Sequence, residues 1–258
     1  MAATTACLII IIMHYIDLNC DMGEGLDNDA AIMPFISSAN IACGYHAGDH
    51  DTMLRTATLA LENKVAIGAH PGFADKENFG RTEQQLSDHA LYELITTQLY
   101  AMQLVCKSLH TTMRHVKPHG ALYNMAAKSP AMARVIVKAV KDVDSRLCFF
   151  GLSNSWLITA AREAGLKTAS EVFADRTYQD DGTLTPRTQP NALIEKEEQA
   201  IAQVLQMVTE QKVTTVNGHT IPITAETICL HGDGAHAVTY ARAINNALHH
   251  HQLTIQRP

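Results

Sequence analysis

The sequence predicts a single-domain α/β barrel, and three observations support this fold class. Short apolar runs alternate with segments of helical spacing along the chain, a pattern typical of a parallel sheet with crossover helices. Six of the apolar runs end in a cluster of polar residues, and such clusters line one mouth of a barrel. The length of 258 residues and the apolar content of 47% suit one large core.

Seven runs have the length and apolar character of buried strands. In chain order they are Tyr15–Asn19, Ala39–Cys43, Val65–Ala69, Arg114–Lys117, Leu147–Gly151, Lys167–Glu171 and Thr227–His231. The helical segments are Thr52–Asn63, Glu83–His110, Pro130–Lys141, Ser155–Ala164, Asn191–Gln211 and Ala235–His249. Local signals mark some helix starts, such as Asp51 before Thr52 and Pro130 after Ser129.

Two segments depart from this alternation. Asp180–Pro190 is rich in turn residues and too polar for a core strand, so we expect a loop over the barrel mouth. Val213–Ile223 carries Asn217-Gly218 between two β-branched runs, which predicts a hairpin at the barrel rim. No repeat or linker indicates a second domain.

The N-terminal stretch Ala6–Met13 is apolar but far shorter than the about 20 residues that a membrane helix needs. No basic residue precedes it and no cleavage site follows it, so we expect no signal peptide. We assign residues 1–12 to an extension, either an upstream start or an extra strand, and residues 13–258 to the barrel domain. The six cysteines form no CxxC pair, which is typical of reduced structural thiols and of a cytoplasmic protein.

The net charge of −6 and the lack of a Lys/Arg-rich run argue against nucleic acid as a partner. We also expect no membrane contact, so small polar substrates remain. The sequence has no phosphate-binding loop of the form GxxxxGK[ST] and no GxGxxG after a strand.

Polar residues gather at the strand ends in six motifs. They are DLNCDMGE (Asp17–Glu24), ACGYHAGDH (Ala42–His50), GAHPGF (Gly68–Phe73), KPHGALY (Lys117–Tyr123), SEVFADR (Ser170–Arg176) and LHGDGAH (Leu230–His236). Burying these groups without a function would cost several kcal/mol. The motifs therefore predict an active site at one mouth of the barrel.

Alternation along each strand predicts which of these side chains point into the barrel together. Asp17, Asn19 and Asp21 share one face. The side chains expected to converge are Asp17, Asp21, His46, His70, His119, His231 and Asp233. The other histidines are expected to be solvated: His14, His89, His110, His115, His219 and His249–His251.

A divalent metal that activates water is one use of such a site. His46 and His50 lie four residues apart, a spacing that would place both on one face of a helix start, although either could instead cap the helix. Cys20 and Cys43 lie near the mouth, but Cys20 is on the outward face and neither has an evident base beside it. Structural thiols are therefore favoured over nucleophiles.

Seven segments resemble the successive signatures of the LamB/YcsF family, in order from about Tyr15 to Ala247. They are DLNCDMGE, NIACGYHAGDH, GAHPGF, FGRT, VKPHGALYN, EVFADRTYQDDGTLTPR and CLHGDGAHAV. The resemblance implies a deformed (β/α) barrel of the glycoside hydrolase/deacetylase type. It also implies ATP-dependent opening of 5-oxoproline to L-glutamate, with this chain as the A subunit of a 5-oxoprolinase that works with subunits B and C.

The resemblance further implies ATP as a cosubstrate, with Mg²⁺ and the partner subunits, which fits the missing nucleotide motif. His50 stands where the family usually has proline, so the His46/His50 spacing loses weight and we assign no dedicated metal. The residues before Met13 lie outside the family pattern.

For this reaction we expect Asp17, Asp21, Lys117 and His119 to be catalytic. One of the two carboxylates would be the general base, since nearby like charges raise one pKa. Lys117 would stabilise the oxyanion or a phosphate, and His119 would give a proton to the leaving amine. The expected substrate-binding residues are Asn19, His46, His70, Glu171, Arg176, Arg187, His231 and Asp233, with the two arginines as anchors for a carboxylate or phosphate.

Two other functions remain open from the residues. The first is a metal-dependent amide or polysaccharide deacetylase on the same barrel. The second is a non-catalytic substrate-binding subunit, which the absence of a nucleotide motif would suit.

Overall fold

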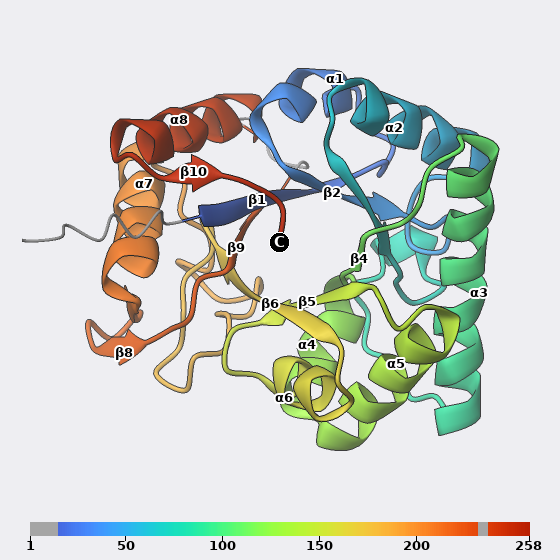
Figure 1. The fold of residues 1–258 in the computed structure, drawn as a ribbon. Helices are drawn as coiled ribbons and strands as arrows, with labels where there is room; N and C mark the ends of the chain where they lie inside the picture. The colour runs from blue at the N-terminus through green and yellow to red at the C-terminus, as the bar shows by residue number, and fades with distance from the viewer. Residues whose placement is uncertain (1–14, 232–236) are drawn as a thin grey trace, which may run out of the picture.

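The computed structural model describes residues 15–231 and 237–258, in which a closed parallel barrel is surrounded by helices (Figure 1). The barrel strands are β1 (Tyr15–Met22), β2 (Ser38–Ala42), β3 (Ala66–His70), β4 (His115–Val116), β5 (Cys148–Leu152), β6 (Lys167–Phe173) and β9 (Thr227–Leu230). Each strand pairs in parallel with the next, and β9 pairs with β1 to close the ring. The predicted single-domain barrel is confirmed.

The helices lie outside the ring of strands (Figure 1). They are α1 (Asp29–Ile32), α2 (His50–Glu62), α3 (Asp88–Ser108), α4 (Gly120–Lys128), α5 (Pro130–Val143), α6 (Trp156–Glu163), α7 (Glu197–Leu205) and α8 (Ala237–His250). Single helical turns occur at η1 (Met33–Phe35), η2 (Lys76–Asn78) and η3 (Gln206–Glu210). The predicted extension 1–12 lies outside the described residues.

Local capping explains where several helices differ from the prediction. The side chain of Asp49 accepts the backbone N–H of Thr52, so α2 begins at His50 and not at Thr52. Ser87 caps α3 in the same way through the N–H of Ala90. Helix α4 was not predicted, because its first turn lies within the KPHGALY motif, directly after a barrel strand of only two residues.

The two irregular segments have the expected character. Strands β7 (Lys212–Thr214) and β8 (Thr220–Pro222) form the predicted antiparallel hairpin, and Gly218 in its turn has a φ of +79°, which glycine adopts without strain. The loop 180–190 contributes residues to the cavity at the barrel mouth. At the opposite end, β10 (Thr254–Ile255) pairs with the start of β1, and Figure 1 shows the C-terminus over the centre of the ring.

Alternation along β1 divides its side chains between two environments. Leu18, Cys20 and Met22 are buried in the apolar core. Asp17, Asn19 and Asp21 are equally buried but bond to polar groups of neighbouring strands. The barrel interior is therefore polar, as the strand pattern predicts.

His115 corrects one prediction, since it was expected to be solvated. It is 2% exposed, its ring stacks on Phe150 at 4.3 Å between centroids, and its Nε2 lies 2.8 Å from Asn40 Oδ1. Burial lowers its pKa to about 3. The reason is alternation: His115 lies two residues before Lys117 and so shares its inward face. Gly68 makes room for this ring, because a Cβ there would lie 2.1 Å from His115 Nε2.

The remaining described histidines of that set are exposed as predicted: His89, His110, His219 and His249–His251. His14 lies outside the described residues. The described cysteines are buried and free: Cys20, Cys43, Cys106, Cys148 and Cys229. Among the residues described, no helix combines the length and apolar character that a membrane crossing requires.

Candidate active site

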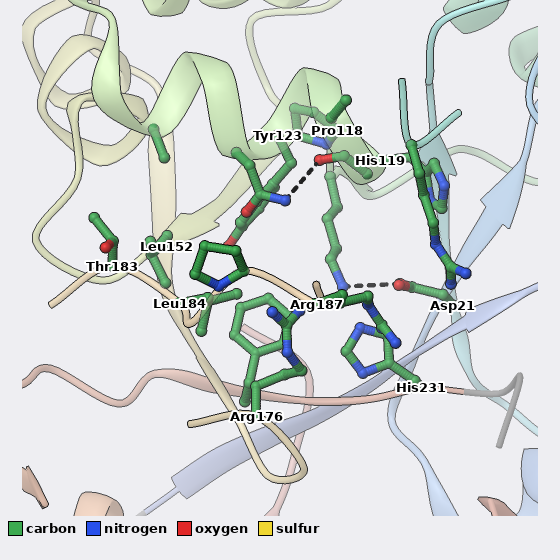
Figure 2. Close-up of a pocket in the computed structure, with 18 of the residues that line it drawn as sticks. Asp21, Pro118, His119, Tyr123, Leu152, Arg176, Thr183, Leu184, Arg187 and His231 are labelled. Atoms are coloured by element: carbon green, nitrogen blue, oxygen red, sulfur yellow. Dashed lines mark hydrogen bonds and ion pairs between the residues drawn. The ribbon is translucent and has the colours of Figure 1, made fainter. Parts of the chain in front are cut away.

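A cavity of about 470 Å³ opens at the carboxyl ends of the barrel strands (Figure 2). Its lining includes these residues predicted for the site: Asp21, His70, Lys117, His119, Arg176, Arg187 and His231. Four predicted residues are buried away from the cavity surface: Asp17, Asn19, His46 and Glu171. Asp233 lies outside the described residues.

The Lys117 ammonium is the central charge of the site. It is 2% exposed, and its Nζ lies 2.8 Å from Asp21 Oδ1 and 2.9 Å from Glu171 Oε1. Burial alone would lower the pKa of Lys117, but the charges of Asp21, Cys229 and Glu171 outweigh it and hold the pKa well above its usual value. Lys117 is therefore a fixed cation in the cavity wall.

Asp21 is the partner of this cation. Its Oδ1 also accepts a hydrogen bond from Asn40 Nδ2 at 2.8 Å, and its Oδ2 lies 3.4 Å from His70 Nε2. Burial acts to raise the pKa of Asp21, but His70 and Lys117 hold it well below the usual value. Asp21 is thus an ionised carboxylate and a weak base.

Asp17 lies on the same face of β1 but four residues deeper, about 13 Å along an extended strand. It accepts hydrogen bonds from three hydroxyl groups, those of Ser37, Ser38 and Thr227. Burial raises its pKa to about 6, and the like charge that adds to this is Glu171. The prediction that one of the two aspartates has a raised pKa agrees with this result for Asp17. The predicted cause, the closeness of Asp21, is wrong, because burial is the main cause.

Asn19 and Glu171 form the layer beneath Lys117. Asn19 Nδ2 donates to Glu171 Oε1 at 3.0 Å and to Thr227 Oγ1 at 2.6 Å. The other oxygen of Glu171 accepts from the hydroxyl of Tyr123 at 2.6 Å. These groups position the lysine, and Tyr123, which also lines the cavity, is a site residue that was not predicted from the sequence.

Three histidine rings pack together beside the charged cluster, two of them stacked and the ring of His70 edge-on to both. His119 Nδ1 lies 2.9 Å from His70 Nε2, and the His46 ring stacks on His119 at 3.8 Å. Burial, reinforced by neighbouring histidines, holds the pKa values of His46 and His119 well below the usual value. Both are neutral rings around pH 7.

Within residues 15–231 and 237–258, two groups of side chains have the spacing to hold a metal ion. One contains Glu24, His46, His70 and His119, and the other contains Asp21, Cys229 and His231. His50 belongs to neither group, because it begins α2 and is exposed. The His46/His50 spacing thus has no metal geometry in the structure.

A histidine in the opposite wall of the cavity is paired with a carboxylate that lies behind it. His231 Nδ1 lies 2.9 Å from both carboxylate oxygens of Asp175. Burial acts to raise the pKa of Asp175, but His231 and Arg187 lower it below the usual value. Asp175 was also not predicted, although it stands beside Arg176 in the SEVFADR motif.

The two predicted arginines differ in their freedom to bind a ligand. Arg176 is buried and donates to the carbonyl oxygens of Thr185 and Ala192, and burial lowers its pKa to about 10. Arg187 is exposed at the cavity rim. Figure 2 shows Arg176 and His231 across the cavity from Tyr123 and His119.

This arrangement suits a small anionic substrate with a polarisable carbonyl group. A buried ammonium can stabilise negative charge that develops on an oxygen atom. The imidazole of His231, oriented by Asp175, can accept or donate a proton. A guanidinium at the rim matches a carboxylate or phosphate.

Known proteins are similar to this chain over nearly its whole length. The LamB/YcsF family model matches residues 16–258. The chain is 51% identical over 241 residues to the A subunit of 5-oxoprolinase from Tolumonas auensis, covering 92% of this chain and 96% of the relative. It is 53% identical over 249 residues to the protein of that name from Shouchella clausii, covering 95% and 98% of the two chains.

A solved structure is similar over nearly the whole fold. The lactam utilization protein of Thermus thermophilus superposes with a TM-score of 0.88 at 38% sequence identity, covering 94% of this chain and 99% of that protein. With a family model that covers almost every described residue, the chain belongs to the LamB/YcsF family.

Proposed function

We propose that this chain is the A subunit of an ATP-dependent 5-oxoprolinase, which opens the lactam ring of 5-oxoproline to give L-glutamate. The observation that carries the proposal is the buried ammonium of Lys117 in the wall of a cavity of about 470 Å³. The names of relatives about half identical over more than nine-tenths of both chains support the choice of substrate.

Ring opening requires three things of the protein. A new bond forms between water and the lactam carbon, the C–N bond breaks, and the ring nitrogen takes a proton. Lys117 stabilises the oxyanion on the former carbonyl oxygen, or a phosphoryl group attached to it. Its fixed charge needs no rearrangement during the reaction, because Asp21 and Glu171 already hold it.

The proton transfers fall to His231 in this proposal. Asp175 accepts the Nδ1–H of His231, which leaves Nε2 as the base that takes a proton from water and returns it to the amine. Asp21 is too weak a base, since its pKa is well below the usual value. Both nitrogens of His119 already face other groups, His70 and the Phe79 carbonyl.

The substrate carboxylate is bound at the rim of the cavity. Arg187 is exposed there, and its guanidinium matches a carboxylate in two-point geometry. Arg176 fixes the loop that carries Arg187, through the carbonyl groups of Thr185 and Ala192.

ATP is used together with partner subunits. Lactam hydrolysis needs coupling, and the sequence has no recognisable nucleotide-binding motif. Subunits B and C therefore supply the nucleotide site, where Mg²⁺-ATP transfers its terminal phosphoryl group to the substrate oxygen and ADP leaves. Addition of one water and cleavage of the C–N bond then give the acyl phosphate of glutamate, which a second water hydrolyses to glutamate and phosphate.

The test is glutamate production from 5-oxoproline and ATP by this chain alone and with subunits B and C. We expect turnover only in the complex, and its loss in Lys117→Ala. Lys107→Ala, a change at an exposed lysine of α3, is the matched control and should retain wild-type turnover. Full ATP-coupled activity of the isolated chain, or wild-type activity of Lys117→Ala, would contradict the proposal.

The same preparations separate the two alternatives. Gel filtration shows whether the Lys117→Ala variant still assembles with subunits B and C. If it assembles but makes no glutamate, this result argues against a non-catalytic binding subunit. Acetate release from N-acetylated sugar oligomers, without glutamate from 5-oxoproline, would favour the deacetylase.

A further inference from the structure

His70 and His119 face each other with nitrogen atoms that two neutral rings cannot both satisfy. His70 Nδ1 lies 2.7 Å from the carbonyl oxygen of Lys117, and His119 Nε2 lies 2.8 Å from that of Phe79. A carbonyl oxygen only accepts, so each of these nitrogens carries the proton of its ring. The other two nitrogens, His70 Nε2 and His119 Nδ1, are then both lone pairs, and they are 2.9 Å apart.

The atoms around this pair are also electron-rich. Glu24 Oε1 lies 3.6 Å from His119 Nδ1, and Asp21 Oδ2 lies 3.4 Å from His70 Nε2. Two nitrogen lone pairs 2.9 Å apart repel unless a positive species lies between them. The species is either a proton shared by the two rings or a metal cation.

His46 distinguishes between the two. It is 1% exposed, and neither of its ring nitrogens makes a hydrogen bond within the described part of the chain. Leaving such a group unbonded in the interior costs about 1–3 kcal/mol. A proton shared by His70 and His119 would leave the ring nitrogens of His46 without a partner, whereas a metal ion can bind a third imidazole. His46 Nε2 lies 3.5 Å from Glu24 Oε1, so it is close to the other groups of the cluster.

The surroundings of the histidines are those of metal ligands. An imidazole that binds a metal commonly donates its other N–H to a backbone carbonyl, as His70 and His119 do here. Glycines allow the rings to pack closely, because a Cβ at Gly72 would lie 2.7 Å from His46 Nδ1 and one at Gly80 would lie 2.9 Å from His119 Cδ2.

We propose that Glu24, His46, His70 and His119 form a binding site for one divalent first-row transition-metal ion of the Zn²⁺ class. One ligand atom of each residue lies within 4.8 Å of the others, and three imidazoles with one carboxylate suit such an ion. The His46 ring is parallel to that of His119, at 7°, so His46 turns on binding, and no hydrogen bond of its ring nitrogens opposes this.

The site goes beyond the reaction proposed above, because it assigns an ion to residues outside the Lys117 cluster. His70 and His119 line the substrate cavity. A bound ion would supply a Lewis acid at the cavity edge.

The experiment is Co²⁺ titration of the full chain after its metal has been removed with a chelator, followed by visible absorption. We expect one Co²⁺ per chain, with d–d bands, and its displacement by Zn²⁺. His46→Gln should weaken Co²⁺ binding by about 100-fold or more, since loss of outer-shell partners alone costs about 10–100-fold. His50→Gln, a change at the exposed residue four positions later, should bind like the wild type.

His46→Gln is chosen because the His46 ring makes no hydrogen bond to any residue that the structure describes, and the thermal unfolding of the variant is measured beside the titration. Absence of Co²⁺ binding by the wild type would overturn the site and leave a shared proton between His70 and His119. Co²⁺ binding that His50→Gln weakens and His46→Gln does not would also overturn it. The readout needs neither substrate nor partner subunits, so it does not depend on the glutamate assay.

Discussion

Asp17 and Asp21 lie on the same face of one strand, are both buried, and have opposite pKa shifts. Asp17, deep in the barrel, is surrounded by hydroxyl donors, and burial raises its pKa to about 6. Asp21, at the mouth, contacts the ammonium of Lys117 and the ring of His70, and its pKa falls well below the usual value. Charged partners, and not burial as such, decide which carboxylate stays ionised.

The two ends of the barrel therefore differ in kind. At the deep end the carboxylate oxygens are satisfied by hydroxyl groups of adjacent strands, which is how an interior polar group is stabilised structurally. At the mouth, a buried cation lies with two carboxylates and, among the described residues, with the ring nitrogens of His46 that make no hydrogen bond. Such a cluster is costly to build without a ligand.

The sharpest test of this contrast compares the same substitution at both ends. Asp21→Asn should lower kcat/KM for glutamate formation by the reconstituted complex by about 1,000-fold, because Lys117 loses its charged partner at the cavity. Asp17→Asn should stay within about threefold of the wild type, since Asp17 does not line the cavity. Equal losses in both variants would show that the two ends do not differ in function.

The next effect is on stability and concerns Asp17 alone. A pKa of about 6 in the folded chain, against 3.8 ordinarily, means that ionisation of Asp17 opposes folding. The protonated carboxyl group of Asp17 therefore stabilises the folded chain. This contribution to the free energy of unfolding is fully present below about pH 3.8, and about 3 kcal/mol of it is lost as the pH rises through about 6.

Urea unfolding of the wild type and Asp17→Asn at several pH values from about 4 to 7 measures this. The free energy of unfolding of the wild type should fall relative to that of the variant as pH rises. If the free energy of unfolding of the wild type instead rose relative to that of Asp17→Asn over this pH range, the raised pKa of Asp17 would be contradicted.

The smallest effect is expected at the opposite wall of the cavity. Asp175→Asn should lower kcat by about tenfold to 100-fold with little change in KM, because His231 loses the acceptor that orients its ring. Asp180→Asn, at an exposed carboxylate bonded to the β7–β8 hairpin, is the control. If Asp175→Asn kept the kcat of the wild type, the assignment of proton transfer to His231 would be wrong.

Strand alternation alone predicted much of the site. It placed Lys117 and Asp21 inside the barrel, and both line the cavity. Alternation could not show that Asp17 lies at the deep end of the barrel, since it assigns a side chain to a face of the strand and not to a depth along it. His115 was missed although the same rule applies to it, because the KPHGALY motif begins only at Lys117.

Other site residues have weaker signals. Asn40 lies in the middle of β2, two residues after Ser38 on the same face, and bonds its register partner Asp21 on the adjacent strand. Asp175 follows β6, where the strand has ended and alternation no longer applies. The pairing of Asp175 with His231 joins residues 56 positions apart, and only the closed barrel brings them together.

One residue joins the two halves of the mouth. The side chain of Lys117 ends among the carboxylates, while its carbonyl oxygen accepts the Nδ1–H of His70. The ring of His70 and the ammonium are thus both held by Lys117. A shift of the Lys117 backbone would therefore move the ring of His70 and the position of the ammonium together.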